Sequence, residues 1–150
     1  MTEVLFYHLQ GQPLDRVLPT LLEKSLERGW KIVVQAASDE RVEAFDAHFW
    51  TYRDEAFLPH GTDRDSDAPH QPVLLTTRDH NPNGANVRFL VDGVALPADA
   101  AVYQRIVLLF DGEDPDAVSQ ARERWSEAKA LGFDLTYWQP DEHGRWQRRG

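Results

Sequence analysis

Short, uninterrupted apolar segments alternate along this chain with segments in which apolar residues recur at helical spacing. This alternation limits the fold more than any other feature. Continuous apolar strands are typical of a parallel sheet that is covered on both faces. The clearest predicted strand spans 105–110 and the first spans 4–7. The other predicted strands span 31–35, 73–75, 87–91 and 133–138.

Three segments between these strands are predicted helices. The first covers 15–28, the second begins after a Ser38 cap and carries Val42, Phe45, Phe49 and Trp50, and the third covers 115–131. Asp114 is a suitable N-cap for the third helix, because Pro115 follows at the first helical position. We therefore expect one α/β domain over residues 1–150, with three layers and a mostly parallel sheet. Residues 139–150 are expected to form a flexible C-terminal extension.

Composition and charge narrow the classes of partner. Hydrophobic residues make up 41% of the 150-residue chain, enough for a packed core, and cysteine is absent. The net charge of -9 repels a phosphate backbone, so no direct nucleic-acid binding is expected. Arg145, Arg148 and Arg149 beside Trp146 are interpreted as a solvated end, with a nucleic-acid contact as the alternative. Residues 1–10 contain no signal peptide and no apolar run is long enough for a membrane span, which predicts a cytoplasmic protein with no membrane contact.

Two enzymatic alternatives each require a motif that can be recognised in the sequence. A nucleotide-binding enzyme of this architecture would carry a glycine-rich loop after the first strand, whereas residues 8–13 contain one glycine and no lysine. A metal site could use the histidines and aspartates of 60–80, but their spacing fits no known ligand pattern. We therefore expect no cofactor, no metal and no catalytic residue. A divergent nucleotide- or metal-dependent α/β enzyme remains the alternative.

The predicted helix 115–131 carries the first candidate binding surface. At 100° per residue, Trp125 and Val118 lie at the edge of an apolar stripe, and Arg122 and Lys129 lie just beyond them. An aromatic side chain flanked by cations suits a peptide with a hydrophobic end and a carboxylate. The same pattern also fits a Trp125 that anchors the core and cations that pair with neighbouring glutamates.

The second candidate surface lies in residues 48–60. Trp50 ends the predicted helix, and Tyr52, Phe57, Leu58 and Pro59 follow in an irregular stretch. Exposed aromatic clusters mark protein interfaces. A small buried cluster beneath the following loop, 59–71, explains the pattern equally well.

Several segments resemble the chi subunit family of the bacterial DNA polymerase III holoenzyme, and the resemblance extends over nearly the full length. Their order and spacing carry the identification, because no segment is decisive alone. The matching segments are 6–9, 29–34, 50–60, 83–87, 110–112, 121–125 and 132–133.

The resemblance implies a fold like that of nucleotide-binding domains without the phosphate loop. It also implies a non-catalytic adaptor that binds two proteins. One is single-stranded DNA-binding protein, whose acidic C-terminal tail ends in Pro-Phe; the matching positions are Arg122 and Trp125, with Phe133 beside them. The other is the psi subunit of the clamp loader, for which Trp50, Phe57 and Pro59 match, and Leu58 lies in the same segment.

The chain departs from some of its relatives within the tail site. Those relatives carry lysine at the positions of Val118 and Ser126, so the cationic site is leaner in this chain. Lys129 is the residue that could replace part of the missing charge. The extension 139–150 is longer than in some relatives.

Overall fold

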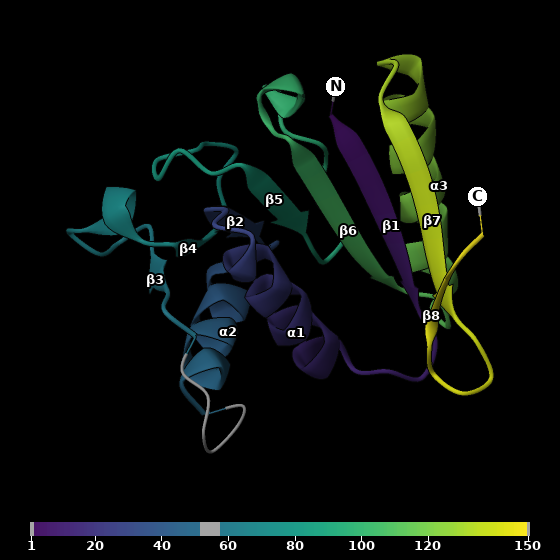
Figure 1. Ribbon diagram of the computed structural model, residues 1–150, viewed down its shortest axis with the longest axis horizontal. Coiled ribbons are helices and arrows are strands. Elements are labelled where there is room, and N and C mark those ends of the chain that lie inside the picture. The colour runs from purple at the N-terminus through teal and green to yellow at the C-terminus, as the bar shows by residue number, and fades with distance from the viewer. Residues whose placement is uncertain (1, 52–57, 150) are drawn as a thin grey trace.

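The computed structural model describes residues 2–51 and 58–149, and its centre is an eight-stranded sheet in the order β3-β4-β2-β5-β6-β1-β7-β8 (Figure 1). All pairs are parallel except β7 with β8. The strands are β1 (Glu3–Leu9), β2 (Ile32–Gln35), β3 (Gly61–Thr62), β4 (Val73–Thr76), β5 (Val87–Leu90), β6 (Arg105–Asp111), β7 (Asp134–Pro140) and β8 (Trp146–Arg148).

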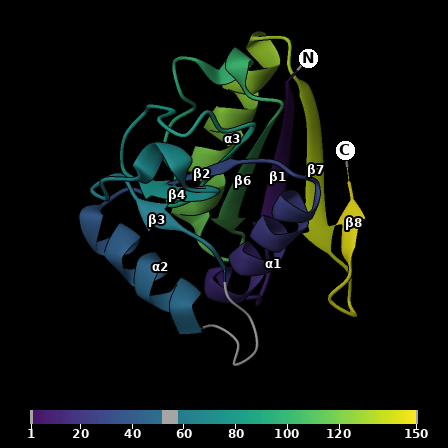
Figure 2. The same cartoon turned by 60° about the vertical axis from the view of Figure 1, so that its left-hand side comes forward.

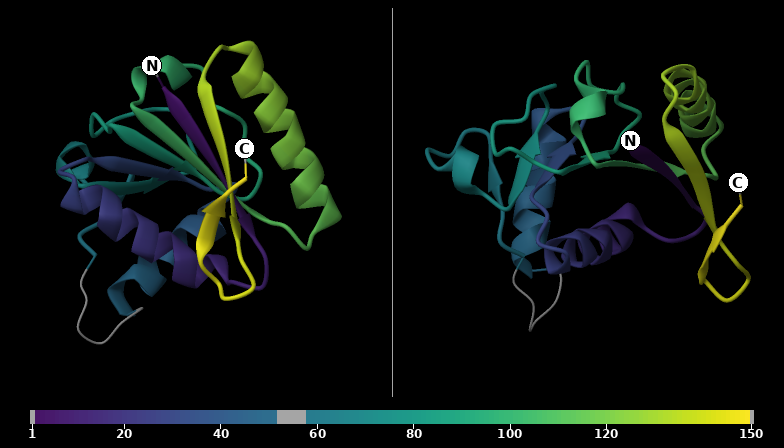
Figure 3. Two further views of the ribbon diagram at one scale, coloured as in Figure 1. Left: turned by 45° about the vertical axis from the view of Figure 1, so that its right-hand side comes forward. Right: turned by 45° about the horizontal axis from the view of Figure 1, so that its top comes forward.

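Three α-helices cover the two faces of the sheet. Helices α1 (Leu14–Glu27) and α2 (Asp39–Thr51) lie on one face, and α3 (Pro115–Ala130) lies on the other (Figure 3). This arrangement confirms the predicted α/β fold with three layers and a mostly parallel sheet. None of the described helices is long and apolar enough to span a membrane.

The sheet separates two hydrophobic cores. Alternate side chains of β1 point to opposite faces of the sheet, so β1 contributes residues to both cores. Val4 and Phe6 point toward α3, together with Ile106 and Leu108 of β6. Leu9 belongs to the opposite core, which is filled mainly by side chains of α1, α2 and β2, and Tyr7 packs against that core. Because successive strand residues face opposite sides, the first strand helps to build both halves of the molecule.

The C-terminal residues return to the edge of the sheet. Strand β7 continues to Pro140, and β8 pairs with it in the antiparallel direction on the side of α1 (Figure 2). Trp146 meets Tyr7 edge-on, with 5.0 Å between the ring centroids. Part of the segment 139–150 therefore belongs to the sheet.

The segment 59–71 is more ordered than the surface loop that the sequence predicts. It contains β3, which pairs with β4, and a short 3-10 helix, η1 (Ala68–His70), whose Ala68 is buried. A second 3-10 helix, η2 (Ala100–Val102), precedes β6. Two-residue strands are invisible to pattern analysis because they are shorter than one period of alternation.

A fully buried arginine fastens the middle of the sheet to the loop between β4 and β5. The guanidinium of Arg88 donates to the side-chain oxygen of Gln35 at 2.6 and 3.1 Å, and to the Tyr103 hydroxyl at 2.9 Å. It also donates to the backbone carbonyls of Arg78 at 2.6 Å and His80 at 2.7 Å. In the part of the chain that the structure describes, no carboxylate pairs with Arg88. Neutral acceptors therefore satisfy all five of its N–H groups.

Replacing Arg88 with methionine should strongly destabilise the fold. The substitution keeps the apolar stem and leaves a set of buried acceptors without donors, so we expect a loss of about 3 kcal/mol or more in the free energy of unfolding. Urea denaturation measures this change. As a control, Arg64→Met on the surface should cost less than about 0.5 kcal/mol. A loss below about 1 kcal/mol for Arg88→Met would contradict this role.

Candidate functional site

Helix α3 lies close to the sheet because small residues face the strands. Ala121 and Ala128 are buried against β6 and β7. The helix begins at Pro115, where the Asp114 carboxylate accepts a hydrogen bond from the Asp116 amide at 3.0 Å. It ends before Gly132, whose φ of +79° is a left-handed conformation that glycine adopts without strain. The positions of the two helix ends determine which larger side chains of α3 lie at the edges of its contact with the sheet.

A cavity of about 410 Å³ opens between α3 and the sheet. Strands β1, β6 and β7 form its floor and α3 forms one wall. The lining residues are Phe6, His8, Phe110, Val118, Ala121, Arg122, Trp125, Ser126 and Tyr137. We call this cavity the α3 pocket.

Two polar side chains from neighbouring strands meet in the floor of the α3 pocket. The Nδ1 atom of His8 lies 2.5 Å from the Tyr137 hydroxyl, which is a short hydrogen bond. The His8 ring also meets the ring of Phe110 edge-on at 5.2 Å. Removal from water lowers the pKa of His8, and the carboxylate of Asp111 opposes that shift.

The α3 wall combines an aromatic ring with a cation. Trp125 is half-buried, and its ring lies 5.1 Å from that of Phe6 and 6.2 Å from that of Tyr137. Arg122 is exposed, and no ion pair holds it within the described residues. Burial raises the pKa of the Tyr137 phenol, and the charge of Arg122 lowers it in part, so the guanidinium acts on the pocket floor. The pocket can therefore receive an apolar group and an anion together.

The structure brings together three of the five residues predicted for the first surface. Val118, Arg122 and Trp125 all line the α3 pocket. Lys129 is exposed further along α3 and is not among the lining residues. Phe133 is half-buried after the helix and packs against the core on the α3 side, outside the lining.

The polar floor of the pocket, His8 and Tyr137, is absent from the predicted site residues. His8 and Phe110 pair in register next to the last residues of β1 and β6, and Tyr137 pairs with Phe6 on the other side of β1. The alternation of β1 places His8 on the same face as Phe6, which was a usable signal. Tyr137 could be added only with knowledge that β7 lies beside β1.

The second predicted surface is partly described. Trp50 on α2 has 54% of its surface exposed, and Pro59 is half-buried. Leu58 is only 1% exposed and belongs to the core beneath α1 and α2. Phe57 lies outside the described residues. We call Trp50 and Pro59 the aromatic surface.

A buried histidine supports the aromatic surface from beneath. The ring of His60 lies 5.1 Å from that of Trp50 and 5.5 Å from that of Phe49. Its Nε2 atom is 2.8 Å from an Asp46 carboxylate oxygen, and its Nδ1 atom is 2.6 Å from the Leu58 carbonyl oxygen. Trp50 therefore packs against the hydrogen-bonded ring of His60, while about half of its own surface is exposed to solvent.

A larger cavity, of about 520 Å³, lies at the carboxyl ends of β1, β5 and β6, where nucleotides bind in related architectures. Its two cations are already engaged. Arg41 lies 3.1 Å from Asp92, and Arg124 lies 2.7 Å from Glu127. Acidic residues also line it, namely Asp92, Asp111, Glu113 and Asp114. This charge balance is unfavourable for a phosphate group.

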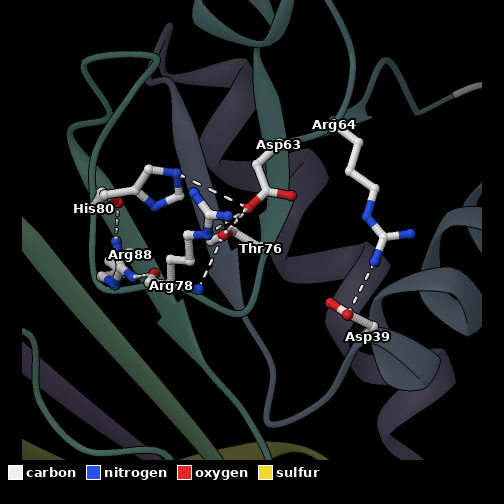
Figure 4. Close-up of polar contacts among 7 residues, drawn as sticks. All are labelled: Asp39, Asp63, Arg64, Thr76, Arg78, His80 and Arg88. Carbon is white, nitrogen blue, oxygen red and sulfur yellow. Dashed lines mark hydrogen bonds and ion pairs between the residues drawn. The ribbon is translucent and has the colours of Figure 1, made fainter.

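The acidic segment considered as a metal site forms a hydrogen-bonded network instead (Figure 4). Asp63 accepts a hydrogen bond from the Thr76 hydroxyl at 2.7 Å, and the side chains of Arg78 and His80 approach it at 4.0 Å. Across residues 2–51 and 58–149, no three histidine or carboxylate side chains converge as metal ligands do. Asp63 therefore joins β3, β4 and the following loop.

Comparison with known proteins identifies the family. The family described as "DNA polymerase III chi subunit, HolC" matches residues 1–136. The chain belongs to this family. A Pseudomonas aeruginosa protein named "DNA polymerase III subunit chi" is 30% identical over 141 residues, covering 90% of this chain and 94% of its own. A Rickettsia prowazekii protein named "Probable DNA polymerase III subunit chi" is 26% identical over 121 residues. This match covers 74% of this chain and 71% of the Rickettsia protein.

Membership of the chi family confirms the resemblance that the sequence segments carry. It makes the chain an accessory subunit of DNA polymerase III with a part in DNA replication. The matched residues 1–136 include all of α3 and nearly all of the α3 pocket, whereas Tyr137 lies one residue beyond them. Of the two polar residues of the pocket floor, the family match therefore covers His8 but not Tyr137.

Replacing Arg122 with alanine should raise the pKa of Tyr137. The guanidinium stabilises the phenolate, so its removal favours the protonated phenol. Titration of the tyrosine ring signals by NMR, with Tyr137→Phe for assignment, measures the shift. Lys129→Ala should leave this pKa unchanged because Lys129 lies outside the pocket. Equal pKa values in wild type and Arg122→Ala would contradict the proposed proximity.

Proposed function

We propose that the chain is a non-catalytic adaptor that joins the clamp-loader assembly of DNA polymerase III to single-stranded DNA-binding protein. One observation carries the proposal: in a member of the chi family, the α3 pocket combines an aromatic cavity with an exposed arginine. This is the combination that an acidic tail ending in Pro-Phe requires. The adaptor would work in the cytoplasm, without a cofactor and without membrane contact.

The α3 pocket suits the last residue of such a tail. A phenylalanine side chain needs an apolar cavity, and Phe6, Phe110 and Trp125 supply aromatic walls at the spacing of ring contacts. The terminal carboxylate needs a planar, bidentate donor, which Arg122 offers at the rim. An exposed cation with no ion pair in the described structure can turn to the ligand without breaking an existing contact.

The acidic residues that precede the end of the tail would meet fewer cations here than in some relatives. Val118 and Ser126 are neutral, Arg124 is paired with Glu127, and Lys129 is the further cation of this part of α3 beside Arg122. We therefore infer modest affinity for a single tail. Single-stranded DNA-binding protein presents several tails, so a high local concentration of ligand compensates for weak individual contacts.

The aromatic surface is the proposed contact for the psi subunit. Trp50 exposes 54% of a large aromatic side chain on α2, across the sheet from the α3 pocket. Exposed tryptophan is enriched among the residues that dominate binding energy at interfaces. Two separate surfaces allow the adaptor to hold both partners at once.

Alanine at position 122 or 125 should weaken binding of an acidic peptide that ends in Pro-Phe by about tenfold or more. Loss of the charged hydrogen bonds of Arg122 costs about 1.5–3 kcal/mol, or roughly 10- to 100-fold in affinity. Trp125→Ala removes an aromatic wall and should cost about tenfold or more. Fluorescence anisotropy with labelled peptide measures both changes.

Two controls separate loss of the site from loss of the fold. Arg64→Ala removes an exposed arginine far from α3 and should leave the affinity unchanged. A peptide with an amidated C-terminus should bind wild type weakly, because the ligand carboxylate is lost. Unchanged affinity in Arg122→Ala and Trp125→Ala would remove the α3 pocket from the proposal.

Replacing Trp50 with alanine should prevent co-purification of the psi subunit and leave peptide binding intact. The expected loss comes from the truncated aromatic anchor, whose removal at an interface costs about 2 kcal/mol or more. Val102→Ala is a matched control because Val102 is also an exposed apolar side chain, at 62%. Retention of psi by Trp50→Ala would exclude the aromatic surface as its main contact.

A further inference from the structure

We propose that His8 and Tyr137 form a second, proton-dependent anchor for the carboxylate of the bound peptide, so that the α3 pocket takes up a proton when it binds its ligand. This inference rests on the proposed function of the pocket. It adds two residues that lie outside the α3 pattern and makes the contact sensitive to pH.

The position of His8 is fixed by its surroundings. The ring is held by the short hydrogen bond to Tyr137 and by the edge contact with Phe110. It also lies against the backbone at Gly112, where a Cβ atom would overlap the imidazole. Glycine at position 112 therefore leaves the space that keeps the imidazole beside the pocket.

The hydrogen bond between His8 and Tyr137 can run in either direction, and protonation selects one. When Nδ1 of a neutral imidazole accepts the hydrogen bond, the Tyr137 hydroxyl uses its only proton inside the pair. When the imidazole is protonated, Nδ1 donates to the Tyr137 oxygen instead. The hydroxyl proton is then free to point into the pocket, where it can donate to a carboxylate. Protonation thus adds a hydrogen-bond donor and a positive charge at the pocket floor.

The groups around His8 determine the direction of the effect. The charge of Asp111 acts on it from the end of β6, the Tyr137 hydroxyl contacts it from β7, and Arg122 acts on Tyr137 from α3. In the free protein, burial lowers the pKa of His8, and Asp111 compensates in part. A ligand carboxylate in the pocket adds a negative charge and should raise the pKa of His8. By linkage, affinity increases as pH falls through the pKa of His8 in the complex.

The test compares peptide affinity between about pH 7.5 and about pH 5.5, where carboxylates with ordinary pKa values stay ionised. The probe is a histidine-free acidic peptide that ends in Pro-Phe, used with the full-length chain. Affinity should strengthen toward the acidic end of this range, by at most about tenfold for each unit by which binding raises the pKa of His8. NMR titration of the His8 ring should show a higher pKa with peptide than without it.

Variants separate the proton-dependent anchor from general packing. His8→Gln should remove the pH dependence, whereas His143→Gln, an exposed histidine in the turn before β8, should retain it. Tyr137→Phe keeps the aromatic packing and removes the hydroxyl, so affinity should fall several-fold at the acidic end of the range. The amidated peptide should show little pH dependence in wild type.

The outcomes distinguish failure of this inference from failure of the proposed function. If the peptide binds through Arg122 and Trp125 but its affinity is flat with pH, or is equally pH-dependent in His8→Gln, the inference is wrong and the function stands. An unchanged pKa of His8 on binding leads to the same conclusion. If the peptide does not bind wild type at either end of the range, the proposed function itself fails.

Discussion

The parallel pairing of β1 between β6 and β7 is the constraint on which the rest of the structure depends. It joins the N-terminal strand to two strands from the far end of the chain. The alternation of β1 then sends Phe6 and His8 toward α3, and Tyr7 and Leu9 toward α1. A slip of one residue would exchange these two sets and remove both cores at once. The α3 pocket exists only in the observed register.

The pocket arises where close packing of α3 stops. Ala121 and Ala128 allow the helix to approach the strands. Trp125 lies at the edge of this contact and lines the cavity together with His8 and Tyr137. The sheet supplies an apolar floor with one polar pair, and the helix supplies the cation. Rigid elements thus hold each side of the pocket, so the proposed peptide would bind with little rearrangement of the protein.

How much of this could be read from the sequence depends on the range of the contacts. The spacing of Val118, Arg122 and Trp125 is a property of one helix, so their common face was predictable and they do meet in the pocket. His8 and Tyr137 are separated by most of the chain, and only the strand order brings them together. Leu58 shows the opposite difficulty, because local composition fitted an exposed and a buried residue equally well, and only the fold shows that it is buried. Arg88 likewise gives no sequence signal of its burial among neutral acceptors.

The most direct test of the account is NMR mapping of the ¹⁵N-labelled chain during titration with an acidic peptide ending in Pro-Phe. The account predicts that shift changes concentrate on α3 around Arg122 and Trp125 and on the facing ends of β1, β6 and β7. It also predicts that α2 and Trp50 stay unperturbed. Changes centred on α2 or on the cavity at the carboxyl ends of β1, β5 and β6, or no changes at all, would contradict it.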